Sequence, residues 1–262
     1  MSYLFNVAKK SDTINKRLGY LLEIANYAQA KVTKSHLPTT KFVIFGTGRS
    51  GSTLLVDMLR SNPQIHCDNE LFHRKLFNPI SFVERRSRMF DTAAYGFKCL
   101  TYQIYEVLGY TDHKKFICDL HALGYKIIYL QRKDTLMQAL SNIYARHRNV
   151  FHARANAHAD EVIKINVDLD VLDDWMQRLD AQKRFERTLL QDIPHLNISY
   201  EKDLKTAENH GAATKKICDF LEVANAVSNP SLRKFSPTRL EDYIENLSEL
   251  RNHLSQTELA AL

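Results

Sequence analysis

The stretch KFVIFGTGRSGSTLLVDMLRSNPQ, residues 41–64, predicts the central unit of an α/β fold. Residues 42–45 form a short apolar run of the kind found in a strand that is buried on both faces. A glycine-rich turn follows, and then comes a helical pattern with one apolar face. That face is formed by Leu54, Leu55, Met58 and Leu59. The stretch therefore predicts a strand, a tight turn, and a helix that packs on the strand.

Three further segments have the apolar, β-branched and aromatic character of strands. They are YGFKCL at 95–100, YKIIYL at 125–130 and HLNISY at 195–200. Helical patterns lie between them, notably at 135–147 and 170–190. Because strands that alternate with helices form parallel sheets, we expect an α/β fold with a mostly parallel central sheet flanked by helices.

The length of the chain favours one domain. A chain of 262 residues can bury a substantial single core. We therefore expect one domain over residues 1–262, with an N-terminal helical extension at 1–40 and a core at 41–255. Within the extension the helical pattern covers 12–34. After Pro237 the apolar spacing predicts a closing amphipathic helix that runs to Leu254.

Composition and charge narrow the class of protein. Hydrophobic residues make up 44% and charged residues 25%, which is typical of a globular protein. The sequence has no apolar run of about 18 residues, so we expect no transmembrane helix. The N-terminus also lacks a signal-peptide core, so we expect a cytoplasmic location. The four cysteines have no C-x-x-C spacing, which argues against a zinc or redox motif. The net charge of +6 suits an anionic ligand, but basic residues spread along the chain do not indicate nucleic acid.

The turn after the first strand has the features of a phosphate site. Gly46 and Gly51 have the spacing of the motif G-x-x-x-x-G-K-[ST], although Ser52 replaces the lysine and Arg49 supplies the positive charge. Such a turn directs backbone N–H groups and the helix dipole at one point. We therefore expect a phosphate to bind there. The candidate residues are Thr47, Gly48, Arg49, Ser50, Gly51, Ser52 and Thr53.

The sequence offers no obvious partner for magnesium. Nucleoside triphosphatases use the motif lysine together with an acidic residue after a strand. Here KIIYLQRKD reaches Asp134 only after Arg132 and Lys133. We expect a nucleotide that binds without a metal ion, and we assign no metal site.

The turn also resembles that of a known family. FGTGRSGSTLLVDMLRSNPQ is similar to the 5′-phosphosulfate loop of sulfotransferases that use 3′-phosphoadenosine-5′-phosphosulfate, and RSGS is common in the carbohydrate and bacterial members. IIYLQRKDTLMQALSNIYA, residues 127–145, resembles the 3′-phosphate element, with Arg132 and Ser141 as candidates. The usual interval is one residue shorter, which makes Lys133 the alternative to Arg132.

Other segments extend the resemblance over most of residues 41–255. NPQIHCDNELF resembles the segment that carries the catalytic glutamate of bacterial members acting on sugars, and the interval from Arg49 to Glu70 is similar to that of the trehalose-sulfating branch. The stretch YEKDL departs from the plainer YEDL of the family. The segments of weaker resemblance are GFK at 96–98, ISYEKDL at 198–204 and SPTRLEDYIENLSEL at 236–250.

The resemblance implies a sulfotransferase that converts 3′-phosphoadenosine-5′-phosphosulfate to 3′-phosphoadenosine-5′-phosphate. The acceptor would be a hydroxyl group of a carbohydrate or glycolipid. Arg49 would offset charge on the leaving phosphate, and Glu70 would act as the general base. Lys98 is a further candidate catalytic residue, and His66, His73 and Lys98 are the alternatives for the base.

Plainer interpretations stand beside these roles. Glu70 has the basic neighbours Arg74 and Lys75, with which a surface acid would pair. Arg132 with Lys133 suits a solvated strand end, and Ser141 suits a surface hydroxyl. For the whole chain, the alternatives are a small kinase or nucleoside triphosphatase with a related loop, and a noncatalytic module that binds anionic ligands. The sequence does not indicate an oligomeric state.

Overall fold

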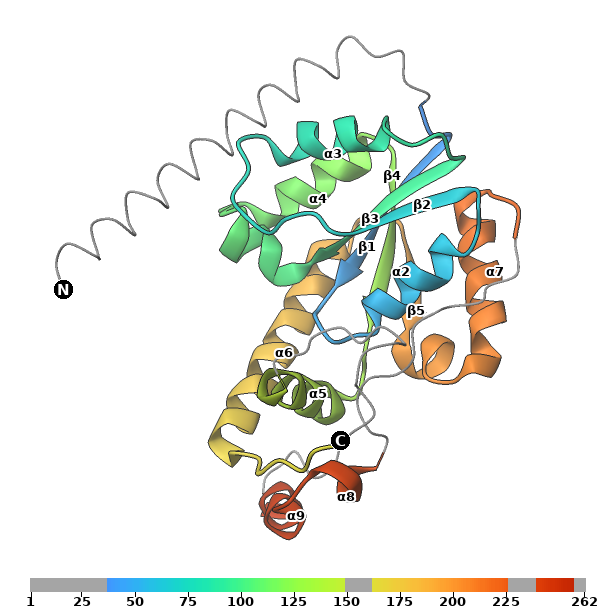
Figure 1. Ribbon diagram of the computed structural model, residues 1–262. Coiled ribbons are helices and arrows are strands. Elements are labelled where there is room, and N and C mark those ends of the chain that lie inside the picture. Colours follow the sequence, from blue (N-terminus) through green and yellow to red (C-terminus); the bar gives the residue numbers. More distant parts are fainter. Residues whose placement is uncertain (1–36, 149–161, 226–238, 257–262) are drawn as a thin grey trace, which may run out of the picture.

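A computed structural model describes residues 37–148, 162–225 and 239–256, and these form an α/β fold around one five-stranded sheet (Figure 1). The strands run in the order β2-β3-β1-β4-β5, and each neighbouring pair is parallel. The prediction of an α/β fold with a parallel sheet flanked by helices is confirmed. The strands are β1 (Thr40–Gly46), β2 (Ile65–Glu70), β3 (Ala94–Leu100), β4 (Tyr125–Gln131) and β5 (His195–Ser199).

Helices cover both faces of the sheet (Figure 1). On one face lie α3 (Pro79–Ser87), α4 (His113–Ala122) and the second half of α6 (Leu169–Leu190). The other face is covered by α2 (Ser52–Arg60) and α7 (His210–Leu221). The first half of α6 packs with α5 (Thr135–His147), α8 (Leu240–Tyr243) and α9 (Leu247–Gln256) in a third apolar cluster. Short turns complete the described elements: η1 (Gln103–Val107), η2 (Tyr200–Leu204) and η3 (Ala207–Asn209).

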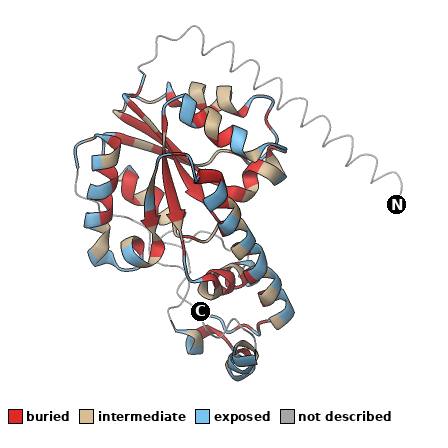
Figure 2. Cartoon of the chain, turned by 180° about the vertical axis from the view of Figure 1, so that it is seen from behind, coloured by how far each residue is buried: buried red, intermediate tan, exposed pale blue. Residues whose placement is uncertain are grey.

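The apolar run of β1 explains why this strand is central. Val43 and Phe45 point into the cluster under α3, α4 and α6, whereas Phe42 and Ile44 point into the cluster under α2 and α7. All four side chains are buried, and Figure 2 shows the strands buried between helices whose outer faces are exposed. A strand with both faces covered needs apolar residues at every position, as the sequence predicted.

Two features differ from the sequence-based expectations. β2 was not predicted as a strand, because IHCDNE is polar and lies at the edge of the sheet. The prediction of a single closing helix was also wrong in part. Ile244 is extended and pairs with Ile165, so this bridge separates α8 from α9.

The described residues leave some expectations untouched. The proposed helix at 12–34 and Pro237, after which the closing helix was expected to begin, lie outside them. The division into a 1–40 extension and a 41–255 core stays a prediction. Among the described residues, none of the helices has both the length and the apolar character needed to cross a membrane.

Candidate functional site

Glycines allow the tight turn that links β1 to α2. Gly46 has φ +155°, and a Cβ there would lie 2.3 Å from the backbone oxygen of Leu130 in β4. Gly51 has φ +90°, and its Cβ would lie 2.8 Å from the ring of Tyr200. Any larger residue would displace the turn from the neighbouring strand or from η2. The sequence therefore places this turn at the carboxyl end of the central strand, where ligands bind in open parallel sheets.

Arg49 connects the turn to α5. Its backbone is left-handed, with φ 60°, which is uncommon for a residue other than glycine. Its side chain donates to Ser141 Oγ, from Nη2 at 3.0 Å and from Nε at 3.3 Å. Arg132 Nη1 donates to the backbone oxygen of Arg49 at 3.2 Å. Three of the residues that the sequence selected thus lie together.

Arg132 and Lys133 differ in where they point. Arg132 is buried, and its guanidinium lies 4.6 Å from the ring centre of Tyr200. Lys133 is exposed, and its backbone N–H donates to Glu201 Oε1 at 3.0 Å. Arg132 therefore contacts the turn through its side chain, whereas the contact of Lys133 with Glu201 is made by its backbone.

Gln138, which the sequence analysis did not select, holds the turn from the side of α5. Gln138 is fully buried in α5, and its Nε2 donates to Thr47 Oγ1 at 2.9 Å and to the backbone oxygen of Gly48 at 2.7 Å. Ser50 Oγ donates to the backbone oxygen of Thr47 at 2.8 Å. The available signal was the spacing of Gln138 from Ser141, because residues three apart share a helix face.

Around the turn, one hydrogen-bond donor and one acceptor have no partner among the described residues. Among the described residues, α2 has no side-chain cap at its N-terminus, which starts at the buried Ser52. Within the same set, Arg132 Nε and Gln138 Oε1 are buried without a hydrogen-bond partner. Burial first, and the nearby charge of Arg132 second, lower the pKa of Arg49 to about 10. Arg49 therefore keeps its positive charge at neutral pH, and a bound anion would relieve the repulsion between the two guanidinium groups.

A bulge in β2 decides where Glu70 points. Asp68 pairs with Phe97 of β3, but the next pair is Glu70 with Lys98, so Asn69 is the extra residue. A bulge of this kind re-aims the side chain that follows it. In a regular register, Asn69 would stand opposite Lys98. The bulge instead brings Glu70 Oε1 to within 3.0 Å of Lys98 Nζ.

The Glu70 carboxylate is held from both sides. Beside the contact with Lys98, its Oε2 accepts from Gln103 Nε2 at 3.1 Å and from the Tyr102 hydroxyl at 3.3 Å. The Glu70 side chain is 15% exposed, whereas that of Lys98 is 2% exposed. A buried lysine and two further donors therefore fix a carboxylate that is still accessible. Tyr102 and Gln103 were missed, and their only signal was their place directly after a predicted strand.

Lys98 joins this carboxylate to the turn. Its Nζ also donates to Thr53 Oγ1, at 3.2 Å, in the first turn of α2. The structure thus brings Glu70, Lys98 and Thr53 together, and Arg49, Arg132 and Ser141 together, around the same β1–α2 turn. The salt bridge predicted by the plainer interpretation of Glu70, to Arg74 or Lys75, is replaced by the one to Lys98.

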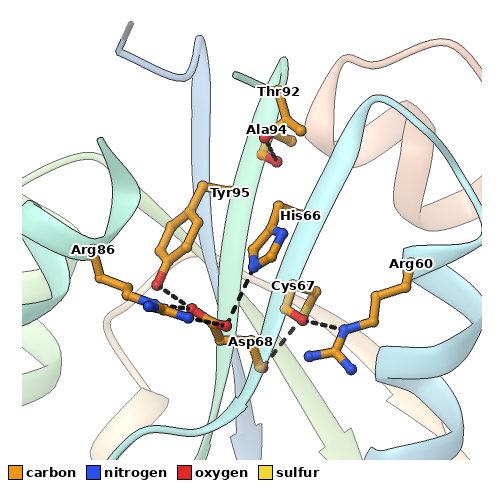
Figure 3. A network of polar contacts seen from close by, with 8 residues as sticks. All are labelled: Arg60, His66, Cys67, Asp68, Arg86, Thr92, Ala94 and Tyr95. Atoms are coloured by element: carbon orange, nitrogen blue, oxygen red, sulfur yellow. Dashed lines mark hydrogen bonds and ion pairs between the residues drawn. The ribbon is translucent and has the colours of Figure 1, made fainter. Parts of the chain in front are cut away.

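Asp68, two residues before Glu70, lies in a separate polar cluster (Figure 3). Its Oδ2 accepts from Arg86 Nε at 2.8 Å and from the Tyr95 hydroxyl at 3.0 Å, and its Oδ1 lies 3.2 Å from His66 Nε2. The His66 ring stacks on Phe90 with 3.4 Å between ring centres. These contacts join β2 to α3 on the face away from α2. His66, an alternative for the base, is therefore occupied on the far side of the strand.

The described residues contain no group of three or more His, Cys, Asp or Glu side chains that could hold a metal ion. Comparison with models of protein families gives no match, and no curated protein matches the chain.

Proposed function

We propose that this protein is a sulfotransferase that uses 3′-phosphoadenosine-5′-phosphosulfate and acts on a hydroxyl acceptor. The observation that carries the proposal is the position of Lys98, which contacts both the Glu70 carboxylate and Thr53 of the glycine-rich turn. A base for an acceptor hydroxyl must lie beside the group that is transferred. The resemblance of the turn to the phosphosulfate loop supports the same choice.

The residues around the turn fit the two phosphates of this donor. The N-terminus of α2 and the hydroxyls of Ser52 and Thr53 would hold the 5′-phosphate, with Arg49 beside it. Arg132 and Ser141 would hold the 3′-phosphate, which selects this nucleotide over ADP or ATP. The buried Arg132 Nε, which has no partner among the described residues, supports this role. The exposure of Lys133 favours Arg132 in the choice that the sequence left open.

The bound donor supplies a sulfuryl group on a phosphate oxygen, and the protein residues manage the charge and the proton. Glu70 takes the proton of the acceptor hydroxyl as the acceptor oxygen forms its bond to sulfur and the bond from sulfur to the phosphate oxygen breaks. Arg49 offsets the negative charge that grows on that phosphate oxygen. Lys98 keeps Glu70 oriented and adds positive charge next to Thr53.

The acceptor class is the finer part of the proposal. Resemblance favours a carbohydrate or glycolipid hydroxyl. The position of residues 142–148 and 162–175, part of which lies on α5 and α6, makes this segment the candidate wall of the acceptor pocket. A screen of sugars and glycolipids with labelled donor would therefore identify the acceptor.

Nucleotide binding gives the first test. A ligand that binds only the folded protein raises the melting temperature. We expect 3′-phosphoadenosine-5′-phosphate to raise it clearly more than ADP, which lacks the 3′-phosphate. Equal shifts would contradict the assignment of Arg132 and Ser141.

Transfer of labelled sulfate to a hydroxyl acceptor gives the second test. Magnesium-dependent turnover of ATP without sulfate transfer would establish the kinase or nucleoside triphosphatase instead. Salt-sensitive binding of anionic polymers that no nucleotide changes would establish the noncatalytic module.

A further inference from the structure

A buried acid on α6 contacts one strand of the sheet and the turn that follows another. Glu186 is 1% exposed, and the hydroxyl of Thr101 donates to its Oε1. The hydroxyl of Tyr129, in β4, donates to its Oε2 at 3.0 Å. Thr101 follows directly after β3 and is fully buried. A carboxyl group in the core is costly unless it is hydrogen-bonded, so its two contacts determine how these segments are held.

The segment that Glu186 holds also carries the donors to Glu70. Tyr102 and Gln103 come directly after Thr101, and both donate to Glu70 Oε2. Gln103 is fixed in turn, because its Oε1 accepts from Leu100 N at 2.9 Å and its Nε2 also donates to the Phe72 backbone oxygen at 3.0 Å. The path from Glu186 to Glu70 thus runs through three consecutive residues of one turn.

We propose that Glu186 is a positioning residue for Glu70, which it holds in place by anchoring the turn Thr101–Gln103. Because Glu70 is the base of the proposed sulfotransferase, the catalytic part of this inference rests on the proposed function. The anchoring itself does not, and it can be measured without any substrate.

The charge state of Glu186 gives the anchor a dependence on pH. Burial raises the pKa of Glu186 to about 7, although the hydrogen bonds from Thr101 and Tyr129 and the charges of Lys183 and Arg187 act to lower it. Among the described residues, Tyr105 of η1 faces it as well. Hydrogen bonds to an ionised carboxylate are the stronger ones. The anchor is therefore firmer above pH 7 than below it.

Two variants remove one hydrogen bond each from the same carboxyl group. Thr101→Val cuts the contact to the turn, and Tyr129→Phe cuts the contact to β4. If Glu186 acts through the turn, Thr101→Val should lower kcat about 10-fold without changing the KM of the donor, because a small displacement of a catalytic group is costly. At pH 9, where Glu186 is ionised in both variants, Tyr129→Phe should leave kcat within about 2-fold. Equal effects of the two variants on kcat would overturn the proposal.

Substitution of Glu186 itself separates its charge from its shape. Glu186→Gln keeps an oxygen that accepts from Thr101 but does not titrate. The wild-type kcat should fall between pH 8 and pH 6 by several-fold more than that of Glu186→Gln. Identical pH profiles would overturn the proposal. Glu186→Leu, which offers no acceptor, should lower kcat at both pH values.

Hydrogen exchange of the amides in residues 100–107 tests the anchor without a substrate. After correction for the intrinsic rates, Thr101→Val should exchange faster than wild type in this segment, and Tyr129→Phe should not. Absence of sulfate transfer by the wild type would remove the proposed function, yet faster exchange in Thr101→Val alone would still support the anchor. Sulfate transfer by the wild type together with unchanged exchange in Thr101→Val would overturn the anchor and leave the proposed function in place.

Discussion

The two acids of β2 stand two residues apart and lie in different surroundings. In a regular strand Asp68 and Glu70 would share one face of the sheet. The extra residue Asn69 breaks this alternation, so that Asp68 faces α3 while Glu70 meets Lys98, which also contacts the start of α2. One bulge at the edge of the sheet thus separates an acid that joins a helix to a strand from one that lies beside the glycine-rich turn.

Both acids are paired with a cation, so the pairing alone does not distinguish them. Asp68 is enclosed by Arg86, Tyr95 and His66, all of which belong to β2, β3 or α3. Glu70 keeps some exposure, and its partner Lys98 contacts the turn as well. What separates a structural acid from a candidate base here is its position relative to the carboxyl end of β1. The predictions below test this difference.

The largest expected effect is on turnover by Glu70→Gln. The amide keeps the size of the side chain but cannot take a proton at neutral pH. It should lower kcat about 10²–10⁴-fold and leave the affinity for 3′-phosphoadenosine-5′-phosphate nearly unchanged. Steady-state kinetics on a confirmed acceptor, with calorimetric titration of the nucleotide, measure the two quantities.

The matched control for Glu70→Gln is Asp68→Asn on the same strand. It should leave kcat within a few-fold of wild type, because Asp68 lies on the far side of β2. Wild-type turnover by Glu70→Gln would exclude Glu70 as the base and move attention to Lys98 or His73. A comparable loss in both variants would show that the two acids do not differ in the way the bulge indicates.

Arg49 should give the next largest effect, because it faces charge in both the bound donor and the transition state. Arg49→Ala should raise the barrier by roughly 2–4 kcal/mol and should also weaken nucleotide binding. Arg49→Lys keeps the charge but loses the fork that contacts Ser141, so it should restore only part of the activity. Single-turnover rates with labelled donor measure the barrier. An Arg49→Ala variant that turns over like the wild type contradicts the assignment of this turn to the 5′-phosphate.

Arg132 and Lys133 allow a comparison of the same kind at the end of β4. Arg132→Ala should weaken 3′-phosphoadenosine-5′-phosphate about 10–100-fold, and its effect on ADP should be much smaller, because only the first nucleotide has a 3′-phosphate. Lys133→Ala should change neither affinity by more than about 2-fold, since its side chain is exposed. Titration calorimetry with both nucleotides checks this. A larger loss in Lys133→Ala would reverse the register that burial favours.

The apolar segments of the sheet were predictable, but β2 was not. β1, β3 and β4 can be recognised from apolar runs, because strands between helices are buried on both faces. β5 is a half-buried edge strand, and its segment was recognised from its β-type residues. β2 has polar residues from Asp68 to Glu70 and pairs with one neighbour only, so its strand character depends on β3. The bulge depends on the same pairing. For this reason the sequence selected Glu70 as a candidate but could not place it opposite Lys98.

The candidate site was predictable where short motifs carry it. Arg49, Arg132 and Ser141 came from two such motifs, and the structure brings them together. Gln138 and Gln103 were missed, because each contacts residues that are far from it in the chain. The choice between Arg132 and Lys133 likewise depends on which of the two side chains is buried at the end of β4, and only the structure gives this. Local patterns identify residue types, while contacts between distant segments identify their orientation.

The smallest effect concerns stability, and it belongs to Asp68. Burial alone would raise the pKa of the Asp68 carboxyl, but Arg86, with further hydrogen bonds from His66 and Tyr95, lowers it below its ordinary value. Because the pKa is lowered, the ionised acid stabilises the folded state at pH values above the pKa of the unfolded state, which is about 3.9. This stability is lost as the pH falls through the pKa of the folded state.

Asp68→Asn should therefore cost about 1–2 kcal/mol of unfolding free energy at pH 7, and the difference from wild type should shrink below about pH 4. Urea denaturation at pH 7 and pH 3.5 measures it, with Asp174→Asn in the exposed pair with Arg178 as a control that should change little. A difference that stays constant over this range would mean that the Asp68 cluster (Figure 3) holds α3 to β2 by packing of its rings rather than by its charge.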